Sequence, residues 1–189
     1  GVPLSSNHAV GTGMAASLAT MPDGAFVAAW LTNTTPFAEH DILCQRFLDD
    51  GSEYGEEILV TGGSEWLACP EVVGFPDGRF VVFWRRGLGV EEWGPNECLG
   101  QWFFTDGTKN GPPFVIESDP DLHIGVSDAT LRASGEAVVL LQHWSPESSL
   151  CGMLVNSDGP NVSFRQACAT AKKLKKILGP GGGEFGAIS

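Results

Sequence analysis

Residues 76–84 read Pro-Asp-Gly-Arg-Phe-Val-Val-Phe-Trp, a turn sequence followed at once by an apolar run. Two further copies stand in the chain, as Pro-Asp-Gly-Ala-Phe-Val-Ala-Ala-Trp at 22–30 and as the weaker Ser-Gly-Glu-Ala-Val-Val-Leu-Leu at 134–141. The glycines of the three copies are 54 and 57 residues apart. A repeat of this length is near that of kelch propeller blades, so each copy is expected to be one sheet-forming unit.

Each copy divides into four short β-type runs joined by glycine turns. The second run is the apolar one, and its continuous Val and aromatic content is typical of a strand covered on both faces. A second glycine turn, as at Asp50-Gly51, joins the third run to the fourth. We expect the first, third and fourth runs to be strands as well. In the first copy these are at 14–19, 42–47 and 57–60, and in the second at 71–75, 98–103 and 114–116. In the third copy they are at 128–131, 150–155 and 161–164.

These runs predict an all-β fold of three four-stranded antiparallel repeat units. The repeats cover about 13–60, 68–116 and 126–165, inside one β domain of residues 1–165. Because such a unit cannot bury its faces alone, the copies must stack on one another. We expect propeller-like stacking, and a β-trefoil is the alternative because it closes with three repeats. A propeller typically has about four to eight blades, so three blades leave both ends of the stack open.

Residues 70–84 and 42–60 together resemble the tandem repeats of large secreted bacterial surface proteins of the RTX and adhesin kind. The resemblance covers about residues 13–165 and is poorest in the third copy, where Leu141 replaces Trp and Met153 replaces Gln. It implies propeller-like blades and a secreted or cell-surface location. The repeated positions of such proteins are structural, so the resemblance brings no catalytic residue with it.

The distribution of charge argues against nucleic-acid binding. The formal net charge is −12, and residues 166–189 hold four lysines and Glu184, so residues 1–165 carry −15. An acidic body of this kind repels phosphate backbones. No apolar run reaches the length of about 18 residues that a membrane span needs. No initiator Met precedes Gly1, so we expect a processed or excised end.

After Arg165 the apolar period changes to that of a helix. Spacings of four, three and four residues from Ala167 to Leu178 predict a short amphipathic helix at 166–178, followed by a Gly-rich flexible tail at 179–189. We expect this helix to dock on protein, either at an open sheet edge of its own domain or on a partner. The candidate contact residues are Lys172, Lys173, Lys175, Lys176 and Phe185.

Tryptophans outside the apolar strands are the candidate ligand-binding residues. Trp66, Trp93 and Trp144 fall in connections between strands, where indole rings stack on sugars or anchor protein interfaces. Asn33 and Asn161 begin glycosylation sequons. The five cysteines lack CxxC spacing, which argues against zinc. They are expected either to form one or two disulfides with one thiol left over or to be buried free thiols.

No motif for a known catalytic mechanism stands in the chain, and the four histidines are scattered. Glu71 and Asp128 occupy roughly equivalent first-strand positions and are the candidate carboxylate pair. Acidic turns at 49–53 and 119–121 offer the oxygen ligands that calcium uses, without the spacing of an EF-hand. We expect no catalytic residue, no metal site and no cofactor, with calcium as the weaker alternative.

The sequence thus predicts a non-enzymatic structural and interaction module. Its partners are expected to be further copies of the chain or the components of a larger extracellular or surface assembly. One alternative is a lectin-like domain that binds carbohydrate through the loop tryptophans. The other is a propeller enzyme that acts on glycosides through carboxylates near the axis.

Overall fold

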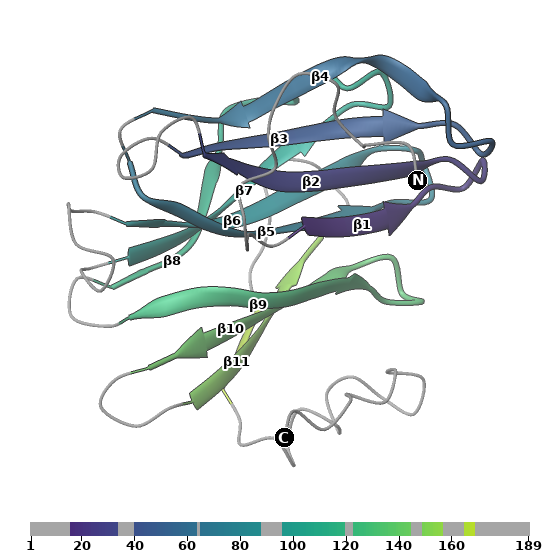
Figure 1. Ribbon diagram of the computed structural model, residues 1–189. Coiled ribbons are helices and arrows are strands. Elements are labelled where there is room, and N and C mark those ends of the chain that lie inside the picture. Colours follow the sequence, from purple (N-terminus) through teal and green to yellow (C-terminus); the bar gives the residue numbers. More distant parts are fainter. Residues whose placement is uncertain are drawn as a thin grey trace, which may run out of the picture.

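The computed structural model describes residues 16–33, 40–63, 65–87, 96–119, 123–144, 149–156 and 165–168 of the chain. Within these ranges the regular structure consists of three antiparallel sheets, and no helix is present (Figure 1). The strands of each sheet pair in chain order, so every sheet is a meander. The predicted all-β fold with three antiparallel units is therefore confirmed.

The strands follow the repeat along the chain. The first sheet consists of β1 (Ala16–Thr20), β2 (Phe26–Asn33), β3 (His40–Phe47) and β4 (Glu53–Thr61). The second sheet consists of β5 (Leu67–Gly74), β6 (Phe80–Gly87), β7 (Asn96–Phe103) and β8 (Phe114–Asp119). The third sheet consists of β9 (Ile124–Leu131), β10 (Ala137–His143), β11 (Ser149–Val155) and the short β12 (Arg165–Cys168).

β12 occupies the start of the segment for which the sequence predicts a helix. It pairs with β11 as an edge strand, so residues 165–168 extend the third sheet. The remainder of the predicted helix and the Gly-rich tail lie outside the described residues.

One turn geometry recurs at the hairpins. In the first hairpin the Met21 N–H donates to the Ala25 carbonyl (2.8 Å), and the Gly24 N–H donates to the Met21 carbonyl (3.1 Å). The same pair of bonds closes the hairpins that begin at Leu48, Phe75, Phe104 and Arg132. The glycine of each of these five turns has a φ between 82° and 86°. A residue with a Cβ atom pays about 1–2 kcal/mol to adopt this left-handed backbone conformation, so glycine is the residue that permits the turn.

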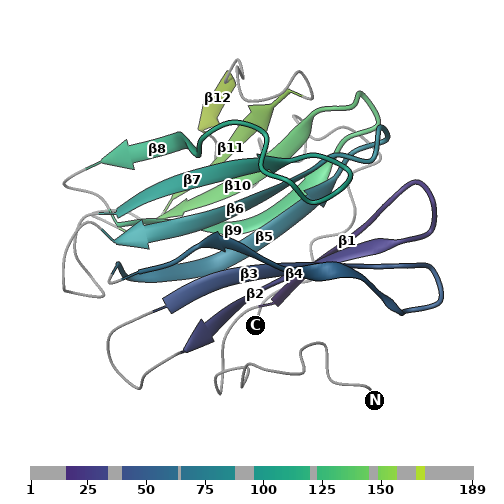
Figure 2. The same cartoon turned by 90° about the horizontal axis from the view of Figure 1, so that it is seen from above.

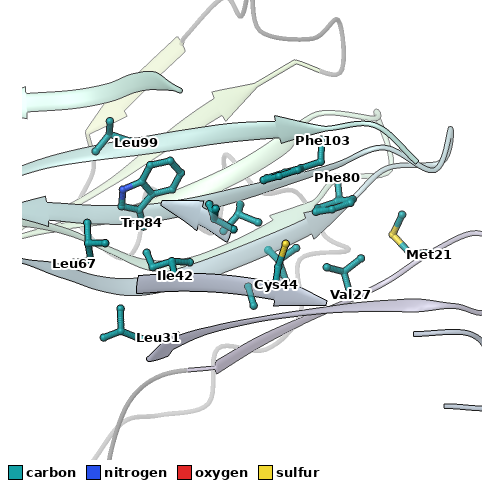
Figure 3. Packing of buried hydrophobic residues seen from close by; sticks show 14 of the residues in the cluster. Met21, Val27, Leu31, Ile42, Cys44, Leu67, Phe80, Trp84, Leu99 and Phe103 are labelled. Carbon is teal, nitrogen blue, oxygen red and sulfur yellow. The ribbon is translucent and has the colours of Figure 1, made fainter. Parts of the chain in front are cut away.

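The second sheet lies between the other two and is covered on both faces (Figures 1 and 2). Along β6, Phe80, Val82 and Trp84 pack with the first sheet, whereas Val81 and Phe83 pack with the third. Figure 3 shows the first of these clusters, in which side chains from both sheets meet. Each of the five side chains is 1% exposed or less. The prediction that this run is covered on both faces is confirmed.

The sheets lie closest together along their first strands. β1 packs beside β5, and β5 packs beside β9, whereas no comparable packing joins β4 to β8. Among the described strands none pairs with a strand of another sheet. This stacking of separate sheets differs from a β-trefoil, in which strands of different repeats pair in one barrel.

The first strands of the second and third sheets begin earlier than predicted. β5 starts at Leu67, and its register with β6 shifts between Ala68 and Glu71, where Cys69 has a φ of 52°. β9 also starts early and has a register shift opposite Leu140. Such bulges interrupt the two-residue alternation on which a sequence-based prediction of a strand depends.

A buried glutamine in each of the first two repeats braces the second hairpin. Gln45 Nε2 donates to the carbonyls of Arg46 (2.9 Å) and Tyr54 (3.1 Å). Gln101 Nε2 donates to the carbonyls of Trp102 and Gly111, both at 2.9 Å. The repeated glutamine is therefore a structural residue that satisfies backbone groups inside the sheet.

We predict that Gln101→Met lowers the free energy of unfolding by about 1–2 kcal/mol, because two backbone carbonyls at a buried site lose their donor. The measurement is the midpoint of urea unfolding. Met153 occupies the equivalent position of the third repeat and provides the matched control. Met153→Leu keeps the volume and has no such bond to lose, so it should cost less than about 1.5 kcal/mol. A larger loss for Met153→Leu than for Gln101→Met would contradict the bracing role.

Candidate functional site

A stacked arginine–tryptophan group lies at one end of the interface between the second and third sheets. The guanidinium carbon of Arg85 lies 4.2 Å from the Trp66 ring centroid and 5.8 Å from that of Trp144. Gly125 permits this contact, because a Cβ atom there would come within 2.9 Å of the Trp144 ring. Arg85 is buried, and Trp144 remains partly exposed. Two of the three predicted binding tryptophans thus contact the same arginine.

Polar side chains bridge the two sheets at the same end. His143 Nε2 lies 3.1 Å from Glu117 Oε1, and its Nδ1 lies 3.2 Å from Ser149 Oγ. Asn96 Nδ2 lies 2.6 Å from His123 Nδ1. Both histidines and Asn96 are buried, and a buried polar group without a partner costs about 1–3 kcal/mol. These bonds therefore fix the position of the third sheet on the second.

Burial keeps the free thiols neutral. It raises the pKa of Cys44 to about 12. The pKa of Cys98 is raised by burial first and by the Glu117 charge second. A neutral thiol is a poor nucleophile and a poor metal ligand. Cys151 is disulfide-bonded, and the register places Cys168 directly opposite it on β12.

Equivalent positions of the three first strands form a row that consists of Ser17, Glu71 and Asp128. Each pairs in register with the fourth residue of the apolar run in its own repeat. Ser17 Oγ donates to Glu71 Oε2 (2.8 Å) and accepts from the Val72 N–H (3.1 Å). Burial raises the pKa of Glu71; the Ser17 hydrogen bond lowers it, and the Asp128 charge raises it further. The predicted equivalence of Glu71 and Asp128 is confirmed.

Asp50 of the acidic turn at 49–53 and Asp106 of the equivalent turn in the second repeat bond to their own turns, whereas residues 120 and 121 of the other acidic turn lie outside the described residues. Asp50 Oδ1 accepts from the Ser52 N–H (2.8 Å) and Oγ (2.6 Å), and Asp106 makes the same two bonds with Thr108. These bonds lower the pKa of both carboxyl groups. In the part of the chain that the structure describes, no group of three or more His, Cys, Asp or Glu side chains is placed to hold a metal ion. Asp50 and Asp106 therefore act as turn residues.

The far face of the first sheet carries an apolar cluster. It consists of Ala28, Trp30, Leu43 and Phe47, with Phe26 packed against it. No described residue of the second or third sheet belongs to this cluster. The rings of Phe26 and Phe47 stack with their centroids 4.8 Å apart. The equivalent pair on the second sheet, Phe80 and Phe103, stacks at the same distance and faces the first sheet.

Leu18 lies at an exposed margin of the far face, whose central residues Ala28, Trp30, Leu43 and Phe47 are each 7% exposed or less. It stands opposite Ala28 on β2 and is 65% exposed. Its equivalent on the second sheet, Val72, stands opposite Val82 and is 3% exposed, because the first sheet covers it. At this position the first sheet exposes a side chain that the second sheet buries.

Several predicted contact residues lie outside the described residues, and so does the side chain of Asn33 at the end of β2. They are Trp93, Asn161, Lys172, Lys173, Lys175, Lys176 and Phe185. No helix in the described ranges is long and apolar enough to cross a membrane.

Sequence reasoning missed the Arg85 contacts with Trp66 and Trp144. Arg85 follows the apolar run in the position that Leu31 holds in the first repeat and Gln142 in the third, so it has no repeat signature. The signal that the sequence offered was the place of Arg85 directly after the apolar run. An arginine that continues a strand covered on both faces must find partners in the neighbouring sheet.

A comparison with models of known protein families finds no match for the chain, and a comparison with curated proteins finds none either. The geometry of the molecule therefore carries the functional argument.

We predict that Glu71→Gln stabilises the folded chain near neutral pH. Because the pKa of Glu71 is raised on folding, the unfolded chain ionises first as the pH rises. The wild type then loses stability relative to the variant, from the ordinary glutamate pKa near 4.5 upward. Gln still accepts the Ser17 hydrogen bond. Urea midpoints measured between about pH 4 and pH 8 should diverge toward neutral pH and converge in acid.

Asp50→Asn is the control of opposite sign, because the pKa of Asp50 is lowered by the Ser52 hydrogen bonds. This variant should be less stable than the wild type at neutral pH, and the difference should disappear as the pH falls through the folded pKa of Asp50. A Glu71→Gln effect that does not change with pH would show that the buried charge is not its cause.

Proposed function

We propose that this chain is a non-enzymatic structural and interaction module. In this proposal its sheets are propeller-like blades, and its end faces join it to further β-sheets in a secreted or cell-surface assembly, as the resemblance to RTX and adhesin repeats implies. The observation that carries the proposal is the contrast between Leu18 and Val72, which hold the same place on equivalent faces and differ in exposure, 65% against 3%.

The far face of the first sheet has the chemistry of a sheet-packing surface. Its centre repeats the stacked Phe pair and the Trp that the second sheet buries against its neighbour. At its margins Leu18 and Leu59 are 65% and 52% exposed. Full burial of one leucine side chain contributes about 1.5–3 kcal/mol, so covering these margins would stabilise an association. A second sheet meets this need through shape as well as polarity.

The two rival functions have less support from the described residues. The indole faces that a lectin would offer to a sugar are partly used at Trp66 and Trp144, since both rings contact Arg85. Glu71, the more buried carboxylate of the first-strand row, already accepts a hydrogen bond from Ser17.

We predict that the wild-type chain associates with rising concentration and that Leu18→Lys abolishes the association. The leucine is mostly exposed in the single chain, so the substitution should leave the stability of the fold almost unchanged. At an interface, however, the lysine ammonium would be buried without a partner. The measurement is the mass in solution by sedimentation equilibrium, starting from the chain mass of 20.0 kDa.

Phe104→Lys is the matched control, because Phe104 is 45% exposed at a hairpin of the second sheet and away from the proposed surface. It should associate like the wild type. A wild-type chain that stays at one-chain mass over the whole concentration range, and whose Leu18→Lys variant behaves identically, would refute self-association through this face.

A further inference from the structure

We propose that residues 1–15 of the same chain pack over the centre of the far face of the first sheet. The inference goes beyond the function proposed above, because it concerns what a single chain does with this face before any partner arrives. Its basis is the burial of four side chains that no described residue of another sheet covers.

The centre of the face is buried in a single chain. Ala28, Trp30, Leu43 and Phe47 are 1%, 3%, 7% and 3% exposed. They form a cluster of their own, to which no described residue of the second or third sheet belongs. Side chains on one face of a sheet have only lateral neighbours unless something packs on that face, and an uncovered face stays in water. Burial this complete therefore requires a layer of the same chain above these residues.

The buried area is narrower than a packed sheet would make it. Leu18 on β1 is 65% exposed and Leu59 on β4 is 52% exposed. By register Leu18 stands beside Ala28, and Leu59 stands beside Leu43, so each exposed residue adjoins a buried one on the same face. The cover thus lies over the two middle strands, which are about 5 Å apart. A single crossing segment of chain has this width, whereas a four-stranded sheet would cover the margins too.

Residues 1–15 have the composition that such a cover needs. They contain no Asp, Glu, Lys or Arg, although 18% of the whole chain is charged. Val2, Leu4, Val10 and Met14 supply apolar side chains along the segment. An uncharged segment gains from removing apolar surface from water and buries no unpaired charge when it does so.

The segment also joins the sheet at the right place. It leads into Ala16, the first residue of β1, which pairs in register with Trp30. From Leu43, the β3 partner of Trp30, the buried cluster extends four residues along the strand to Phe47, a distance of about 13 Å. Fifteen residues span up to about 50 Å when extended, so the segment is long enough to cover the cluster from end to end.

The other parts of the chain fit this place less well. Residues 34–39 join β2 to β3, and the middle of a six-residue connection lies within about 10 Å of the strand ends. Phe47 is at the opposite end of β3, about 23 Å from His40. Residues 169–189 follow β12 of the third sheet, from which the second sheet separates the first. They also carry four lysines, and an ammonium group buried on an apolar face is costly.

Hydroxyl-radical labelling of the full chain, read by mass spectrometry of its peptides, tests the cover. In a Leu4→Asp/Val10→Asp variant the segment should leave the face, because two carboxylates would otherwise be buried there. Oxidation of Trp30 is expected to rise at least about fivefold over the wild type. Trp84 is 1% exposed between the first and second sheets, so it should stay protected and serves as the internal control for the fold.

Leu174→Asp/Ile177→Asp is the matched control variant in the C-terminal segment and should leave the oxidation of Trp30 unchanged. If this variant exposes Trp30 and the Leu4→Asp/Val10→Asp variant does not, residues 169–189 are the cover and the inference is wrong. It is equally wrong if neither variant changes the oxidation of Trp30.

Cross-linking within the chain gives a second test that does not open the face, and it decides the matter if Trp84 is oxidised too. Val10→Cys is combined with Leu59→Cys at the margin of the face, or with Phe104→Cys at a hairpin of the second sheet, where Phe104 is 45% exposed. Both chains and the wild type are treated with a short bis-maleimide. The single-chain cross-link should be at least about tenfold more abundant with Leu59→Cys. Equal yields, or no product in either chain, would overturn the inference.

The cover has a consequence that rests on the proposed function. A further sheet can reach the centre of the face only after residues 1–15 move aside, so the Leu4→Asp/Val10→Asp variant should associate at a lower concentration than the wild type in sedimentation equilibrium. If the labelling and the cross-link support the cover but neither chain associates, the cover stands and the proposed self-association fails. If the wild type associates and Trp30 stays protected in the variant, the reverse holds.

Discussion

The structure depends on one constraint, the double-sided apolar character of β6. Phe80, Val82 and Trp84 point to one side and Val81 and Phe83 to the other, and all five are removed from solvent. A strand of this kind needs a sheet on each side. The first and third sheets supply them, so the stacking of three sheets follows directly from the residues of a single run.

Polar contacts complete the stack where the apolar contacts end. Arg46 Nη1 donates to the Thr105 carbonyl of the second sheet (2.7 Å), while its Nη2 pairs with Asp23 of its own sheet (2.6 Å). At the junction of the second and third sheets, His143 bridges to Glu117. Apolar packing fixes which faces meet, but it is non-directional. The hydrogen bonds set the sheets in one relative position, because an unmade buried bond is costly.

The apolar runs and the glycine turns could be predicted from the sequence because both are local. Five hairpins share one geometry that Gly at a positive φ permits, and most strands beside them end or begin where the pattern indicates, although β4 begins at Glu53 instead of residue 57. The early halves of β5 and β9 could not be predicted, since bulges break the alternation there. The Arg85 contacts with Trp66 and Trp144 join residues of different sheets, and a local pattern carries no information about such pairs.

The third repeat shows which repeated residues depend on one another. In the first two repeats a buried glutamine lies ten residues before a glycine with a φ of 77°, and the glutamine amide lies within hydrogen-bonding distance of the carbonyl of that glycine. The third repeat has Met153 and Ser163 at these two places, so it lacks both members of the pair. A glutamine at position 153 would not find the glycine partner that Gly55 and Gly111 provide, and methionine fills the space without a polar amide to satisfy. The loss of the glutamine is therefore one coupled change in the second hairpin, and the apolar run of β10 still packs on the second sheet.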